Sequence, residues 1–155
     1  MYRTARYLSC LSVIVLLCAC KTPRPENPAP CVPQTQLERL LRWGTEHDSA
    51  STVEQYTMNS KGEIFYYHGP QDKRSDGEFL VAIDQTDYCS LSKHVTDAFL
   101  KTQALNVRGK RGRFIDFRNP RTDVYLRAVW NPDLNTFQSR DVREVYDELM
   151  KQIPR

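Results

Sequence analysis

The pattern of apolar and polar residues predicts a β-hairpin in the first half of the chain. Residues 53–58 and 63–68 mix β-branched and aromatic residues with polar ones, and Asn59-Ser-Lys-Gly62 between them is a typical turn sequence. A short apolar run over residues 79–83 (Phe-Leu-Val-Ala-Ile) predicts a third strand. These three segments are short and close together, so we expect neighbouring antiparallel strands.

A second hairpin is predicted further along. Residues 114–118 and 124–130 are rich in β-branched and aromatic residues, and they flank the turn Asn119-Pro-Arg-Thr-Asp123.

Helical spacing of apolar residues predicts three helices. Thr35 and Glu38 have the spacing of a capping box, and leucines at helical spacing follow them until Gly44. The two later helices are predicted from these apolar positions: Tyr88, Leu91, Val95, Ala98, Phe99 and Thr102 in one, and Val142, Val145, Tyr146, Leu149, Met150 and Ile153 in the other.

The predicted order of elements is therefore α-β-β-β-α-β-β-α within residues 35–155. Hairpins in place of β-α-β crossovers indicate an α+β fold, with a small antiparallel sheet of about five strands and helices on one face. A length of 155 residues, with 40% apolar and 26% charged residues, suits one folded domain.

Residues 1–19 have the features of a signal peptide. Arg3 and Arg6 precede an uncharged, mostly apolar stretch over residues 8–19. A membrane-spanning helix needs about 20 such residues, whereas a signal peptide needs about 7–15.

The end of this stretch resembles the lipobox of bacterial lipoprotein precursors. Leu17, Ala19 and Cys20 of Leu17-Cys18-Ala19-Cys20 match the pattern of that family. The resemblance implies cleavage before Cys20, with diacylglycerol on its sulfur and usually an acyl chain such as palmitate on its amine. Lys21 is not the aspartate that resembles an inner-membrane retention signal, so we expect an outer-membrane anchor with the domain facing the periplasm.

Residues 20–34 are predicted to be the lipidated cysteine and a stiff spacer. Five of the nine prolines lie here, at positions 23, 25, 28, 30 and 33. Each proline fixes its own backbone and disfavours helix at the residue before it, so the segment should be extended.

The cysteine count predicts one disulfide. Cys10 and Cys18 leave with the signal peptide and Cys20 carries lipid, so Cys31 and Cys89 remain in an oxidising compartment. Our interpretation is a structural bridge between them; a buried Cys89 with an idle Cys31 is the alternative.

The charge distribution points to one unusual segment. Residues 108–127 hold seven cations and two acids, although the whole chain has 22 Lys and Arg against 19 Asp and Glu. This segment is therefore the candidate contact surface for an anionic partner; the alternative is a solvated hairpin whose charges protect an exposed edge strand. The proposed contact residues are Arg108, Lys110, Arg111, Arg113, Arg118 and Arg121.

Short motifs add little chemistry. Ser90-Leu-Ser-Lys93 resembles the nucleophile motif of penicillin-recognising enzymes, but the chain is too short for that fold. Gly109-Lys-Arg-Gly112 resembles the G-x-x-G loop of KH domains, but it precedes a strand pattern and does not join two helices. We expect no metal, cofactor or nucleic-acid partner and assign no catalytic residue.

The sequence thus predicts a lipid-anchored envelope protein whose domain binds an envelope partner, as an accessory subunit, pilot or inhibitor. Two other functions stay open: a small envelope enzyme with a site assembled from scattered residues, and a structural link between outer membrane and cell wall.

Overall fold

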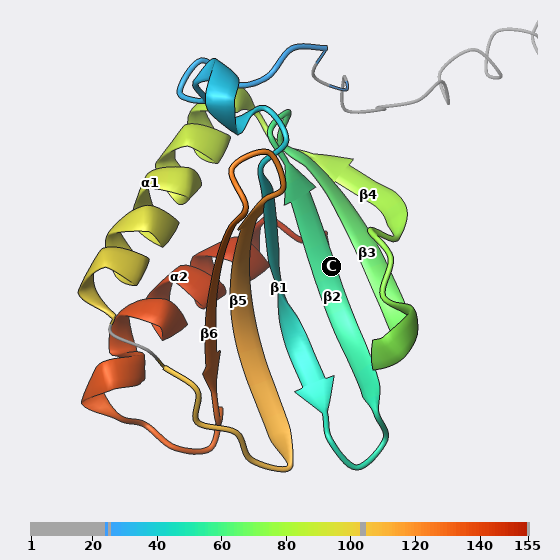
Figure 1. Cartoon of the computed structure of the whole chain (residues 1–155), viewed down its shortest axis with the longest axis vertical. Coiled ribbons are helices and arrows are strands. Elements are labelled where there is room, and N and C mark those ends of the chain that lie inside the picture. The colour runs from blue at the N-terminus through green and yellow to red at the C-terminus, as the bar shows by residue number, and fades with distance from the viewer. Residues whose placement is uncertain (1–23, 25, 103–104, 155) are drawn as a thin grey trace, which may run out of the picture.

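Six antiparallel strands form one sheet in the spatial order β4-β3-β2-β1-β5-β6 (Figure 1). The computed structural model describes residues 24, 26–102 and 105–154. The strands are β1 (Leu40–His47), β2 (Thr52–Asn59), β3 (Glu63–Pro70), β4 (Glu78–Ala82), β5 (Arg111–Asn119) and β6 (Val124–Trp130). The helices are α1 (Gln85–Lys101) and α2 (Arg140–Lys151), and the 3₁₀ turns are η2 (Gln34–Gln36), η3 (Gln71–Lys73) and η4 (Phe137–Ser139). The predicted α+β class is confirmed.

Both helices cover the same face of the sheet and close the main core against it (Figure 1). Trp43 of β1 and Trp130 of β6 are fully buried there, and the Trp130 ring meets the Tyr146 ring of α2 edge-on at 5.4 Å. The Asp84 carboxylate caps α1 by accepting from the Asp87 backbone N–H at 2.8 Å. Burial of the apolar stripes of the two helices thus fixes which face of each strand is the core face.

The predicted first helix is wrong, because residues 40–47 form strand β1 at the centre of the sheet. Leu41 and Trp43 alternate into the core, while Arg42 and Glu46 project from the opposite face. Both faces of this strand are largely buried. The polar residues between the apolar ones therefore do not face solvent, as they would in a strand with one exposed face. The sheet has six strands instead of five, and only η2 remains of the predicted N-terminal helix.

Part of the predicted spacer packs on the domain. Ala29 and Val32 belong to the main core, and the Ala29 N–H donates to the Ser60 carbonyl at 3.1 Å. The disulfide between Cys31 and Cys89 is present, with the two Cα atoms 5.7 Å apart. It fastens this segment to the first turns of α1, so the fold begins before residue 35.

The loop between β3 and β4, residues 71–77, folds over the other face of the sheet. The Gln55 side chain of β2, fully buried, donates to the Ser75 carbonyl at 3.1 Å, and Arg42 of β1 binds Asp76 at 2.7 Å. Gly77 has a φ of +91°, and a Cβ there would lie 2.1 Å from the Tyr66 carbonyl oxygen. Glycine therefore allows the loop to return this closely to β3.

Candidate functional site

A cluster of charged side chains lies beneath loop 71–77. The carboxylate of Glu46 in β1 is bound by the guanidinium groups of both Arg74 and Arg127. Arg127 of β6 also donates to both carboxylate oxygens of Asp116 in β5 at 2.7 Å. The Arg74 and Arg127 guanidinium carbons lie 5.2 and 4.9 Å from the Phe114 ring centroid. We call Glu46, Arg74, Asp116 and Arg127 the ion cluster.

The two carboxyl groups of the ion cluster have opposite pKa shifts. Burial raises the pKa of Asp116 to about 6, although the attraction of Arg127 opposes this rise. Burial also acts to raise the pKa of Glu46, but hydrogen bonds and attraction from Arg74 and Arg127 outweigh it, and the net pKa lies below its usual range. The shifts differ because Glu46 has hydrogen bonds from both Arg74 and Arg127, whereas burial dominates at Asp116.

The ion cluster is best understood as a structural tie. Its two acids balance its two arginines, and both carboxylates are nearly inaccessible, each residue being 3% exposed. A general acid needs contact with a reacting group, and loop 71–77 lies over this part of the sheet. The cluster therefore holds the loop to β1, β5 and β6.

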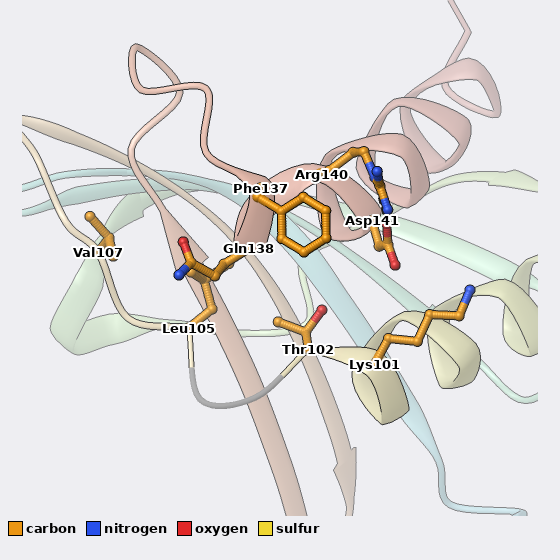
Figure 2. A pocket seen from close by; sticks show the side chains of 8 residues that line it. All are labelled: Lys101, Thr102, Leu105, Val107, Phe137, Gln138, Arg140 and Asp141. Atoms are coloured by element: carbon orange, nitrogen blue, oxygen red, sulfur yellow. Dashed lines mark hydrogen bonds and ion pairs between the residues drawn. The ribbon is translucent and has the colours of Figure 1, made fainter.

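A cleft of about 740 Å³ opens at the C-terminal end of α1, against η4 and the start of α2 (Figure 2). Figure 2 shows the Phe137 ring at its centre, with Val107 on one side and Lys101 on the other. Phe137 is 80% exposed, and the Arg140 guanidinium lies 4.9 Å from its ring centroid. The lining residues are Lys101, Thr102, Leu105, Val107, Phe137, Gln138, Arg140 and Asp141.

Three of the predicted partner contacts lie beside this cleft. Arg108, Lys110 and Arg111 are exposed on the segment that follows Val107. This segment packs against the loop before η4, because a Cβ on Gly109 would lie 2.5 Å from the Asn131 side chain. Arg111 reaches Asp133 of that loop at 3.4 Å.

The other three predicted contacts lie elsewhere. Arg113 is on the helix-covered face, 4.8 Å from the Tyr146 ring centroid and 3.9 Å from the Asp147 carboxylate. Arg118 lies near the far end of β5, and Arg121 donates to the Gln34 carbonyl at 3.1 Å. Arg111 and Arg118 are seven residue steps apart along β5, or about 23 Å at 3.3 Å per step. The six residues therefore do not share one surface.

A second hollow, of about 310 Å³, lies on the other side of the end of α1, against η2, β5 and β6. Its lining is mostly apolar, but it contains Arg39, which is only 8% exposed. The guanidinium carbon of Arg39 lies 4.6 Å from the Phe117 ring centroid. Burial lowers the pKa of Arg39, with a smaller opposing effect from Tyr88.

A groove between α1 and α2 is polar and acidic. His94 of α1 contacts the Glu148 carboxylate of α2 at 2.7 Å, and Asp97, Asp141 and Glu144 also line the groove. In residues 26–102 and 105–154, His, Cys, Asp and Glu do not come together in a group of three that could hold a metal ion.

The lipid-attachment residue predicted from the sequence, Cys20, lies outside the described residues. Within them, the helices lack the length or the apolar character that crossing a membrane requires. No family model matches the chain, and a search of curated proteins finds no similar sequence.

Sequence reasoning missed Phe137, Arg39 and the ion cluster. Phe137 stands in an irregular segment before α2 that carried no periodic pattern, and the partners of Arg127 lie on two other strands. The one available signal was the alternation of Arg42 and Glu46 with Leu41 and Trp43.

Proposed function

We propose that this chain is a lipid-anchored envelope protein whose α+β domain binds an acidic partner protein at the cleft beside Phe137. The observation that carries the proposal is an exposed aromatic ring that shares a cleft with Lys101 and Arg140, beside a segment with three further exposed cations. Contiguous exposed apolar groups on a soluble domain commonly mark protein-binding sites. We call this surface the partner face; it comprises Val107, Leu134 and Phe137 with Lys101, Arg108, Lys110, Arg111 and Arg140.

Charge gives the partner face its selectivity. Three of its five cations have an acid nearby: Arg111 contacts Asp133, Arg140 contacts Asp141, and Lys101 attracts Asp97. An acidic partner would gain association rate from these cations and affinity from burying Phe137 and Val107. The predicted lipid on Cys20 would hold the domain at the membrane where such a partner is found, since two or more acyl chains anchor a protein stably.

A photo-cross-linking experiment tests this function in the intact lipoprotein. A photoreactive phenylalanine analogue at position 137 should cross-link one defined envelope protein in living cells. The same analogue at Phe79, an exposed aromatic residue of edge strand β4, is the matched control and should not trap that protein. Absence of a specific product at 137, or the same product at 79, would refute the partner face.

Charge variants test the cations separately. The triple variant R108S/K110S/R111S should weaken the cross-link at 137 in a salt-dependent way, while R118S/R121S at the opposite end of β5 should not. Sedimentation with purified cell-wall sacculi tests the structural-link alternative. If the parent binds sacculi, the triple variant does not, and no protein cross-link forms, the partner is the cell wall and not a protein.

A further inference from the structure

The most buried arginine that the structure describes lacks a counter-ion. Arg39 is 8% exposed and makes no ion pair or side-chain hydrogen bond with any described residue, and its Nε is completely buried. Burying a charged group without a partner is strongly unfavourable. The guanidinium lies over the face of the Phe117 ring and close to Tyr88, and its buried Nε–H has no hydrogen-bond acceptor among the described residues.

Other partly buried arginines of this fold are compensated. Arg127 binds two carboxylates, Arg42 binds Asp76, and Arg143 donates to the carbonyls of Asn131 and Pro132. The Nε of Arg42 is also buried without a partner, but its Nη2 binds a carboxylate. Arg39 differs from these arginines because its guanidinium has no carboxylate or carbonyl partner among the described residues.

Arg39 lines the apolar hollow beside α1. Val95, Phe99 and Leu100 of α1 form one wall, and Phe117 and Leu126 of the sheet form the other. Leu100 is 81% exposed, so the hollow is open to solvent at this side. A buried cation at one end and an apolar trough leading away from it suit a molecule with an anionic head and an apolar tail.

We infer that this hollow binds a small fatty-acid-like monocarboxylate, with the carboxylate on Arg39 and the alkyl chain against Phe99, Leu100 and Leu126. A guanidinium offers paired N–H donors that match the two oxygens of a carboxylate. The ion pair would supply the charge that the fold does not provide.

The size of the hollow sets the length of the ligand. A volume of about 310 Å³ holds roughly ten groups the size of a water molecule, at about 30 Å³ each. A carboxylate and a tail of about seven further carbons fill this space, so octanoate is the matching probe. The site lies on the opposite side of the end of α1 from the partner face and does not depend on it.

Calorimetric titration of the full mature protein with octanoate, below its micelle-forming concentration, tests the inference. Affinity should rise from butanoate to octanoate and then level off, because longer tails extend into solvent. Methyl octanoate and octanol, which lack the charge, should bind at least about tenfold more weakly. No saturable binding of octanoate, or equal binding of the ester, would overturn the site.

Two variants separate ligand binding from a structural role of Arg39. R39M keeps an unbranched side chain without the charge and should weaken octanoate binding at least about tenfold, while its melting temperature should not fall. R118M, on the same strand as Phe117 but on the opposite face, is the matched control and should bind octanoate as the parent does. A lowered melting temperature of R39M with unchanged octanoate affinity would make Arg39 a structural residue and refute the site.

The tail side is tested by L126N on strand β6. This substitution should reduce the affinity for octanoate much more than the affinity for acetate, because acetate has no tail to contact position 126. If R39M does not fold, the head-group and chain-length series on the parent protein still decides the question.

Discussion

Asp116 and Arg127 face each other on adjacent strands β5 and β6, and Arg127 Nη1 donates to both Asp116 carboxylate oxygens at 2.7 Å. Arg127 favours the ionised carboxylate, but burial has the larger effect and raises the pKa of Asp116 to about 6. In the unfolded chain this carboxyl has its ordinary pKa of 3.8. Between pH 3.8 and about 6, Asp116 is therefore mostly protonated in the folded protein and mostly ionised in the unfolded chain.

This difference predicts a pH-dependent stability. A group with a raised folded-state pKa favours the folded state below pH 3.8 and loses that contribution as pH rises through about 6. The full contribution is about 3 kcal/mol, at 1.36 kcal/mol per pKa unit, and roughly 2 kcal/mol of it should be lost between pH 4 and 7. Urea unfolding of the parent and of D116N across this range should give free energies whose difference changes by about this amount. Parallel pH profiles would contradict the raised pKa.

Glu46 should be the most sensitive acid of the ion cluster. E46Q removes the charge that both Arg74 and Arg127 contact, so it should lower the free energy of unfolding by about 3 kcal/mol, as removal of one partner from a buried ion pair does. E54Q, at an exposed position of β2, is the control and should stay within about 0.5 kcal/mol of the parent. Chemical denaturation measures both, and equal stabilities would show that the ion cluster contributes nothing.

Removing the disulfide should loosen the N-terminal segment before it unfolds the domain. The double variant C31S/C89S opens a loop of 58 residues, which costs up to about 4 kcal/mol by the chain-entropy model. Limited proteolysis should then cleave near Ala29 and Val32 while the sheet stays protected. Thiol counting on unfolded, unreduced mature protein should find no free thiol from Cys31 or Cys89; two such thiols would refute the bridge in the native protein.

The lipid anchor stays a prediction, with a direct test. C20A removes the sulfur that would carry diacylglycerol, so the protein should remain an uncleaved precursor. Intact-mass analysis of the parent should show an acylated chain that begins at Cys20. A mature chain without acyl groups would refute the lipoprotein assignment.

Local sequence patterns predicted most of the strands and both long helices. The two hairpins, the strand at residues 79–83 and the two helices are confirmed, since apolar residues at helical spacing indicated the helices, and β-branched, aromatic or apolar runs beside turn sequences indicated the strands. Strand β1 was mistaken for a helix because it is buried on both sides: Arg42 and Glu46 are polar yet enclosed beneath loop 71–77. Leucine spacing around residues 37–41 then gave a false helical period.

The candidate sites were harder to predict, because they depend on contacts between distant residues. The cations of residues 108–127 were counted as one charged segment, but the fold sends Arg127 into the ion cluster and leaves Arg108 exposed. Arg39 gave no signal at all, since its lack of a counter-ion is a property of its surroundings. Composition can show an excess of charge, whereas only the fold shows which charges are neutralised.

The position of β1 at the centre of the sheet has a consequence for the order of folding. Leu40 is paired with Asn59 on one side and with Arg118 on the other. The first neighbour arrives through a short turn, whereas the second requires closure of a much longer stretch of chain, which is entropically costly and slow. The meander β1–β4 can therefore assemble while the far edge of β1 still lacks its partner. Until β5 docks, that edge is an open template for strands of other molecules, so the rate of β5 docking governs the competition between folding and aggregation.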